Sequence, residues 1–195
     1  MPLGGQMDTP QSESLKGHFL MAMPGLLDPN FFQTVTCISE HTPEGALGLV
    51  INRIHQTLTG DVIFNKLKIT APKDATSIPV FIGGPVHIGE VFVLHGAPFH
   101  WEGCLQVTPS LGMSNTIDIL EAIAMGVGPD AFQLTLGCAG WGEGQLEEEI
   151  KQNAWLTSPA IDEIIFRIPV EQRWEAALQR LGVDPGLLSG TAGHA

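Results

Sequence analysis

The residues best suited to chemistry lie between Gly137 and Glu147, where the sequence is GCAGWGEGQLE. A glycine-rich turn that leads into a helix could bind phosphate through the free N–H groups of the helix start. This stretch has neither the GxxxxGK[ST] nor the GxGxxG spacing, and carboxylates near the helix start would repel an anion. These carboxylates are Glu143, Glu147, Glu148 and Glu149. We therefore interpret the run from Gly137 to Gly144 as a packing turn, because glycine permits positive φ angles and a close approach of strand and helix.

The three cysteines, Cys37, Cys104 and Cys138, are an odd number without CxxC spacing, and each lies in an apolar stretch. This pattern favours buried free thiols over a disulfide framework. Cys138 precedes the predicted helix, where the pKa of a thiol can be lowered, but its neighbours Leu136 and Ala139 indicate an inert thiol. We predict no catalytic residue from the sequence.

Three histidines, His41, His95 and His100, could supply imidazole ligands to a metal. No HExxH motif and no zinc-type Cys/His spacing accompanies them, so we predict no metal and no cofactor. Lone histidines at strand ends more often bond to the backbone. Because His41 and His95 both lie near glycine-rich ends, a shared ligand pocket is the alternative.

Polar and aromatic residues at the ends of apolar blocks are further candidates for ligand contact. Capping and turn formation is the simpler interpretation, above all for Asn52, which closes a predicted strand. Trp141 stands between two glycines, and a large ring in a tight turn is expected to be partly exposed and to mark an interaction surface. The predicted ligand-binding residues are His41, Asn52, His95, Trp141, Gln145 and Glu147.

Hydrophobic periodicity and turn residues predict the elements that position these side chains. Strands are predicted over 18–23, 34–39, 46–51, 79–82, 91–95, 104–107, from 132 onwards and over 163–168. Helices are predicted over 60–67, between 115 and 126, after 144 and over 171–181, and a loop over 52–59. The second and third strands should form an antiparallel hairpin, and 79–82 should pair with 91–95. Paired strands followed by grouped helices predict an α+β fold: one compact domain with a mostly antiparallel or mixed sheet and three to four helices.

Composition excludes several classes of protein. A chain of 195 residues with 44% apolar residues can build one globular core. Nine basic against 21 acidic residues give a net charge of −12, which disfavours direct nucleic-acid binding, since phosphate contacts depend on cations. No apolar run is long enough to cross a bilayer and no secretory signal is recognisable. We therefore expect a cytoplasmic protein without membrane attachment, with a flexible leader over 1–14, a domain over 15–184 and a loose tail over 185–195.

Several blocks of the sequence together resemble the YqgE/AlgH family of small bacterial proteins. They are GHFLMAMPGLLDPNFFQTVTCISEH (17–41), GALGLVIN (45–52), GGPV (83–86), FVLH (92–95) and GCAGWGEGQLEEEI (137–150). The resemblance implies a compact α+β domain whose mixed sheets curl towards a barrel. It implies no assigned activity, although one branch of the family carries a transcription-regulator label. The family usually has tyrosine where this chain has Cys138, so a cysteine nucleophile there is not a family-wide mechanism.

Three functional hypotheses follow. The first is a non-enzymatic binding or regulatory domain that acts through a protein partner or a small ligand, because no catalytic constellation is recognisable. The second is a hydrolase or transferase with a site near the Gly137–Glu147 turn, the Gly83–Gly84 bend and His41 or His95. The third is a transcription regulator, which the acidic charge disfavours as a direct DNA binder.

Overall fold

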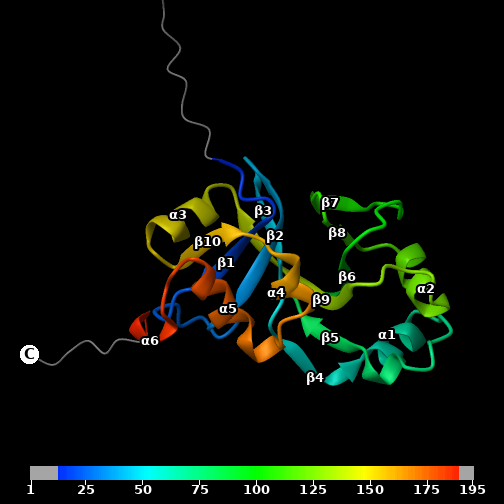
Figure 1. Cartoon of the computed structure of the whole chain (residues 1–195). Coiled ribbons are helices and arrows are strands. Elements are labelled where there is room, and N and C mark those ends of the chain that lie inside the picture. Colours follow the sequence, from blue (N-terminus) through cyan, green and yellow to red (C-terminus); the bar gives the residue numbers. More distant parts are fainter. Residues whose placement is uncertain (1–12, 189–195) are drawn as a thin grey trace, which may run out of the picture.

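A single long strand, β9 (Phe132–Gly142), runs through the middle of the sheet in the computed structural model, which describes residues 13–188 (Figure 1). Its first part pairs antiparallel with β6 (Val86–His95) on one side and parallel with β5 (Pro79–Ile82) on the other. Its last part pairs antiparallel with β3 (Gly45–Val50). Because β9 pairs with β5 and β6 along its first part and with β3 along its last part, it fixes the position of the strands around β6 relative to those around β3.

The sheet has ten strands in the order β10-β1-β2-β3-β9-β6-β8-β7, and β4 joins it beside β5. The remaining strands are β1 (His18–Ala22), β2 (Val35–Thr42), β4 (Ile54–Thr59), β7 (Leu105–Thr108), β8 (Leu111–Ser114) and β10 (Trp155–Pro159). The predicted single α+β domain with a mostly antiparallel sheet is confirmed. The expected barrel-like curl is wrong, because β10 and β7 end the order as separate edges and the sheet stays open.

The described part of the chain has more helices than the three to four predicted. They are α1 (Gly60–Lys66), α2 (Ile117–Met125), α3 (Gln145–Lys151), α4 (Asp162–Phe166), α5 (Arg173–Arg180) and α6 (Pro185–Leu188), with short 3-10 turns η1 (Ala75–Ser77) and η2 (Val170–Gln172). Within this range, no helix is both long and apolar enough to cross a lipid bilayer.

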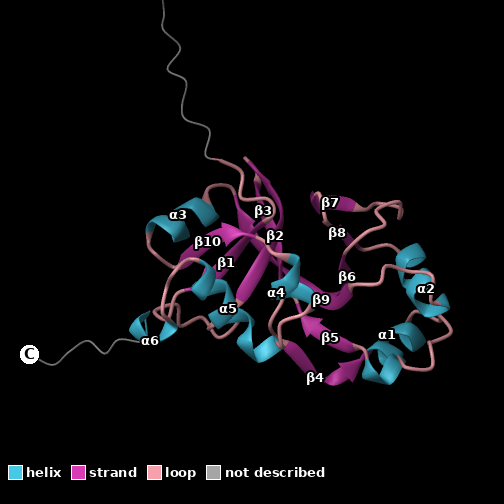
Figure 2. Cartoon of the chain, in the orientation of Figure 1, coloured by secondary structure: helices cyan, strands magenta, loops and turns pink. Residues whose placement is uncertain are grey.

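Helices cover both faces of the sheet at β1. Phe19 and Met21 pack in one core cluster with residues of α4 and α5, whereas Leu20 and Ala22 pack in a second cluster with α3. Since successive side chains of a strand point to opposite faces, α3 and α5 lie on opposite faces of the sheet (Figure 2). A strand that is buried on both faces has a continuous apolar sequence, which accounts for the run FLMA.

A third core cluster forms where β6 and β9 meet α1 and α2. Val93 and Leu134 pack there against Phe64 of α1 and against Ile119 and Ile123 of α2. Both helices lie where helical spacing predicted them, although Phe64 and Ile119 were not among the residues expected to face inward. Gly126, in the left-handed conformation at φ 73°, ends α2 as predicted.

The glycine-rich stretch is a strand and not a turn over most of its length, so the predicted turn over 137–144 is wrong. β9 continues to Gly142, and the chain turns only at the following residues, with Gly144 at φ 69° before α3. Gly137 has φ +68°, and a Cβ atom there would lie 2.7 Å from the carbonyl oxygen of Gly84. The glycines therefore permit a close approach of two backbones, as predicted, but of β9 to the segment at Gly84 and not to a helix.

Three local predictions are corrected by the structure, two of them by the pairing of strands. Residues 54–59, predicted as loop, form β4 against β5. The strands β5 and β6 do not pair with each other, because β9 lies between them. Residues 163–168, predicted as a strand, are mostly the helix α4, whose Ile164 and Ile165 are buried in the core; a short apolar run does not distinguish a strand from a buried helix.

The predicted ends of the domain fall largely outside the described residues. The leader was predicted over 1–14, of which only 13 and 14 are described, and the tail over 185–195, of which 185–188 form α6. The boundaries of the domain at 15 and 184 stay predictions. The confirmed elements near them are β1, which begins at His18, and α5, which ends before Gly182.

Candidate functional site

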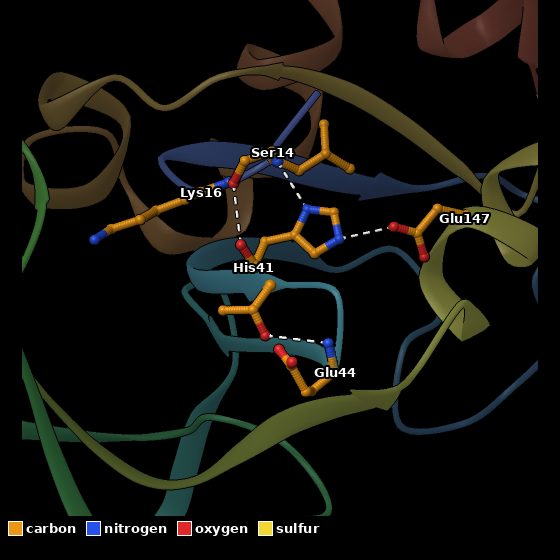
Figure 3. A network of polar contacts seen from close by, with 7 residues as sticks. Ser14, Lys16, His41, Glu44 and Glu147 are labelled. Atoms are coloured by element: carbon orange, nitrogen blue, oxygen red, sulfur yellow. Dashed lines mark hydrogen bonds and ion pairs between the residues drawn. The ribbon is translucent and has the colours of Figure 1, made fainter. Parts of the chain in front are cut away.

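His41, on β2, is bonded through both nitrogens of its ring (Figure 3). The backbone N–H of Leu15 donates to Nδ1 at 2.8 Å, and Nε2 lies 2.8 Å from Oε1 of Glu147 on α3. Because Nδ1 accepts a hydrogen bond, Nε2 carries the proton and donates to the carboxylate. The side chain of His41 is only 5% exposed. The contact connects β2, α3 and the segment before β1.

This bonding leaves His41 no nitrogen for proton transfer to a substrate. A general base needs a lone pair within reach of the substrate proton, and the lone pair at Nδ1 is held by the N–H of Leu15. Ser14, whose hydroxyl donates to the His41 carbonyl oxygen at 3.2 Å, strengthens the same attachment (Figure 3). In this arrangement His41 and Glu147 hold three segments together.

Trp141 and Gln145 meet at the carboxylate of Glu149, which was not among the predicted ligand-binding residues. Trp141 and Trp155 both donate their indole N–H to Oε2 of Glu149, at 2.9 and 2.8 Å, and Gln145 donates to Oε1 at 2.9 Å. The indole rings pack against each other and against Phe31 at ring-centroid distances of 5.4 to 6.1 Å. Trp141 is 6% exposed, so the expectation of a partly exposed ring is wrong. Its indole N–H is satisfied inside the protein by the carboxylate of Glu149.

Asn52 closes the connection between β3 and β2. Its Oδ1 accepts the N–H of Val35, and its Nδ2 donates to the carbonyl oxygen of Gln33, both at 2.8 Å. Both polar ends of the amide thus replace backbone partners at the start of β2, which is the simpler of the two roles predicted for it. Contact of Asn52 with a ligand stays a prediction.

His95, at the end of β6, is fully buried and lies beside a thiol and a hydroxyl. Its Nδ1 lies 2.7 Å from the carbonyl oxygen of Gly96, and its Nε2 lies 3.0 Å from Oγ of Ser114 and 3.7 Å from Sγ of Cys104. Since a carbonyl only accepts, Nδ1 carries the proton and Nε2 is the acceptor. Burial lowers the pKa of His95, and the bond to Gly96 opposes that shift.

His41 and His95 are not brought together. Their strands, β2 and β6, are separated by β3 and β9 in the sheet. Through its register, His41 lies level with Trp141 on β9, whereas His95 lies level with Phe132. Nine residues of strand correspond to roughly 30 Å, so one pocket does not contain both rings. Within residues 13–188, no group of three metal-ligating side chains is found either.

Two of the three cysteines are inert by environment. Burial raises the pKa of Cys37 to about 12 and that of Cys138 to about 11, with Asp162 and Glu90 adding to the respective shifts. A thiol with such a pKa forms little thiolate near neutral pH. Cys104 differs, because it is only partly buried and lies beside the ring of His95.

A groove of about 370 Å³ lies between the start of β9, β5 and the segment from α4 to α5. We call it the Arg173 groove; among its lining residues are Phe81, Phe132, Gln133, Phe166, Arg167 and Arg173. Arg173 is the first residue of α5 and is 6% exposed. The volume of the groove falls in the range of small-molecule sites, roughly 300 to 1,000 Å³.

The guanidinium of Arg173 is held by uncharged groups. Nε donates to the carbonyl oxygen of Ile168 at 3.0 Å, and Nη1 donates to that of Ile51 and to Oε1 of Gln133, the latter at 2.8 Å. Its Cζ atom lies 5.4 Å from the ring centre of Phe81. No carboxylate of the described residues forms an ion pair with it. Burial lowers the pKa of Arg173 to about 10, with Glu171 opposing, so the group stays charged at neutral pH.

Gln133 contributes a donor that has no partner among the described residues. Because Arg173 donates to Oε1 of Gln133, the orientation of the amide is fixed. Its buried Nε2 then has no hydrogen-bond partner within residues 13–188. A buried polar atom of this kind calls for a water or a ligand. Two donors that favour an oxygen, one of them charged, thus belong to neighbouring residues of the groove.

Sequence reasoning missed Glu149, Arg173, Gln133 and the pairing of Cys104 with His95. One signal for Arg173 was present: it lies four residues before Ala177, on the buried face of α5. A cation on the apolar face of a helix indicates a buried partner or a site. The other three features depend on contacts between distant segments, and no spacing in the sequence marks them.

Known proteins are similar to this chain over nearly its whole length. A family model described as AlgH-like matches residues 19–186. A UPF0301 protein of Desulforapulum autotrophicum is 53% identical over 189 residues, which is 97% of this chain and 100% of that protein. One of Thioalkalivibrio sulfidiphilus is 49% identical over 184 residues, 94% of this chain and 98% of that protein.

Two solved structures have folds similar to that of this chain. The solution structure of the AlgH protein from Pseudomonas aeruginosa has a TM-score of 0.77 and 45% identity, and covers 97% of this chain and 100% of that one. A crystal structure of a protein from Corynebacterium diphtheriae has a TM-score of 0.72 over 94% of this chain and 95% of that one. At 21% identity, the second likeness concerns the fold alone.

Proposed function

The chain belongs to the AlgH-like family, and we propose that it is a non-enzymatic binding domain that holds a small organic anion in the Arg173 groove. The observation that carries this proposal is the buried guanidinium of Arg173, which lacks a carboxylate partner among the described residues. A buried charge without a counterion is costly. An anionic ligand would supply that counterion.

The charges around the groove support an anion. Arg167 and Arg173 line it, against a single carboxylate, that of Asp130. Glu171 lies close enough to affect the pKa of Arg173 but does not line the groove. The whole chain has only nine basic residues against 21 acidic ones. Two of those nine at one groove make it locally cationic on an acidic protein, which concentrates anions there.

The walls of the groove support an apolar body on the anion. The rings of Phe81, Phe132 and Phe166 line it, and Ile165 and Val170 add aliphatic surface. A carboxylate or a phosphate attached to a flat or branched apolar group would place its charge at Arg173 and Gln133 and its body on these walls. A volume of about 370 Å³ suits such a molecule. A protein partner needs a far larger contact, about 800 Å² on each side, so the groove favours the small ligand of the two occupants predicted.

The two alternative functions have less support. A hydrolase or transferase near Gly137–Glu147 requires a base, and both ring nitrogens of His41 are committed to Leu15 and Glu147. A direct DNA-binding regulator requires a basic surface, and the net charge of −12 opposes it. Binding without catalysis requires neither feature.

The test compares probes that share one apolar body. Benzoate and phenyl phosphate carry the anion, benzyl alcohol is neutral and benzylamine is cationic. With the full-length protein, isothermal titration should show binding of the two anions only. The anions should also raise the melting temperature, since a ligand that binds only the folded state stabilises it. Equal binding of benzyl alcohol and benzoate, or no binding of any anion at millimolar concentration, would overturn the proposal.

Variants then locate the site. Gln133→Met and Arg167→Gln should each weaken benzoate about three- to tenfold, which corresponds to about 1 kcal/mol for one lost polar contact. Lys66→Gln, an exposed residue of α1, is the control with the same loss of charge as Arg167→Gln and should leave the affinity unchanged. If Lys66→Gln weakens benzoate as much as Arg167→Gln does, the anions respond only to net charge and the groove is not their site.

A further inference from the structure

We infer that Cys104 and His95 form a thiol-exchange site, in which the thiol of Cys104 forms mixed disulfides with small disulfide molecules. The inference is independent of the Arg173 groove, because none of the residues involved lines that groove. It depends on the geometry of three side chains from different segments: Cys104 before β7, His95 at the end of β6 and Ser114 at the end of β8.

The tautomer of His95 leaves Nε2 unprotonated, where it faces both the hydroxyl of Ser114 and the thiol of Cys104. The N–H at Nδ1 is used by the carbonyl oxygen of Gly96 at 2.7 Å. Nε2 therefore faces Sγ of Cys104 at 3.7 Å, within the reach of a hydrogen bond to sulfur, and Oγ of Ser114 at 3.0 Å. A thiol paired with a base that a third group orients is the arrangement that activates a sulfur nucleophile.

The surroundings keep the pair aligned. Gly112 lies beside it, where an added Cβ atom would come within 3.1 Å of both Sγ of Cys104 and Cε1 of His95. The ring of Phe99 lies 5.9 Å from the imidazole, centre to centre. His95 and Ser114 are buried. The base is thus fixed in the core while the thiol is next to exposed residues, Glu102 and Gly103.

Accessibility separates Cys104 from the other two thiols. Cys37 and Cys138 are fully buried, whereas Cys104 keeps part of its surface exposed. A small disulfide can reach only a thiol with exposed surface, and the attacking species must be a thiolate. Of the three cysteines, all within residues 13–188, Cys104 combines partial exposure of the residue with a neighbouring imidazole.

The exchange balances without a further reagent. The proton of the Cys104 thiol passes to Nε2 of His95, and the thiolate attacks one sulfur of the small disulfide. A new S–S bond forms as the old one breaks, and the departing thiolate takes the proton from the imidazolium. One thiol and one disulfide give one mixed disulfide and one small thiol, so no electron is gained or lost overall. The hydroxyl of Ser114 can accept from the protonated Nε2 during the transfer.

The experiment uses cystamine or oxidised glutathione with the full-length native protein at pH 7, followed by intact mass and peptide mapping. We expect one adduct per chain, at Cys104, formed about tenfold faster than on the same cysteine in the urea-unfolded chain. Cys104→Ser should give no adduct. An adduct first at Cys37 or Cys138, or a native rate at Cys104 no faster than in the unfolded chain, would overturn the inference.

Variants separate the base from mere accessibility. His95→Asn should slow the reaction at pH 7 about tenfold or more, in keeping with the effect of a general base, and the gap should close as the pH rises above the pKa of a free thiol, about 8.5. His100→Asn makes the same change at an exposed histidine outside the site and should stay within about threefold of the wild type. A His95→Asn variant that reacts as fast as the wild type refutes the role of His95. If that variant does not fold, the comparison of native with unfolded chain decides.

Discussion

His41 and Glu147 lie 106 residues apart in the sequence, and their side chains meet with 2.8 Å between Nε2 and Oε1. The pair joins β2 to α3 on the face of the sheet that α3 covers. A second His–Glu pair, His87 and Glu90, has a similar distance of 3.0 Å, but both of its side chains are more than half exposed. The two pairs therefore allow the energy of a partly buried His–Glu contact to be compared with that of an exposed one.

We expect His41→Ala and Glu147→Ala each to lower the free energy of unfolding by about 1 to 3 kcal/mol, because each leaves a partner group in a partly buried place. In a double-mutant cycle measured by urea unfolding, the coupling energy should be at least about 0.5 kcal/mol. The same cycle on His87 and Glu90 should give a smaller coupling, as exposed ion pairs do. Equal coupling energies for the two pairs would contradict a structural role for His41.

The carboxylate of Glu149 accepts hydrogen bonds from three donors. We therefore predict that one substitution lowers the free energy of unfolding and that a second restores part of it. In Glu149→Gln, one amide oxygen can still accept from both indoles, but the new NH₂ group then faces the NH₂ group of Gln145. We expect a loss of about 1 to 3 kcal/mol in unfolding free energy. Adding Gln145→Glu reverses that donor and acceptor and should restore part of the loss at unchanged net charge.

The measurement for this pair is urea unfolding followed by tryptophan fluorescence, which Trp141 and Trp155 report directly. Glu148→Gln is the control, because that exposed carboxylate bonds only to the side chain of Gln152 among the side chains described. It should change stability by less than about 0.5 kcal/mol. A double variant no more stable than Glu149→Gln would refute the proposed exchange of donors.

The close approach of β9 to Gly84 predicts that Gly137 tolerates no side chain. Gly137→Ala places a Cβ atom 2.7 Å from the Gly84 oxygen at a φ of +68°. The left-handed conformation alone costs about 1 to 2 kcal/mol for alanine, so we expect a loss of about 2 kcal/mol or more in a denaturant titration. Gly89→Ala, in open space on β6, should be near neutral. A neutral Gly137→Ala would show that the two backbones are free to separate.

His95 predicts a pH dependence of stability. Its pKa in the folded protein is lowered by burial, while that of the unfolded chain is about 6.5. Below pH 6.5 the unfolded state therefore binds more protons, and the free energy of unfolding falls until the pH reaches the folded pKa. Urea midpoints between pH 7.5 and 5 should decline less steeply in His95→Asn than in the wild type. Identical slopes would contradict the lowered pKa.

The elements that sequence reasoning predicted correctly depend on local patterns. Strands β2 and β3 form the predicted antiparallel hairpin, because alternation of apolar and polar residues flanks a short turn. The helices α1, α2 and α5 follow from helical spacing and from the glycines that end two of them. Each of these signals acts within about ten residues along the chain, and sequence alone contains them fully.

The elements it missed depend on partners far away in the chain. Residues 54–59 are polar enough for a loop and become β4 only because β5 pairs with them. The apolar run around Ile164 and Ile165 suits a strand or a helix, and packing on the core decides for the helix α4. The strand β10 is recognisable only as the partner of β1.

Local patterns in the sequence were enough to predict the α+β class, the family resemblance and the acidic character. Contacts between distant segments were needed to show that both ring nitrogens of His41 are hydrogen-bonded, that Arg173 and Gln133 line one groove, and that Cys104 lies against His95. The two groups of features differ in how far apart along the chain the interacting residues lie. Periodicity and backbone freedom act between near neighbours, whereas the role of a polar side chain is fixed by the donors and acceptors that strand register brings to it across the sheet.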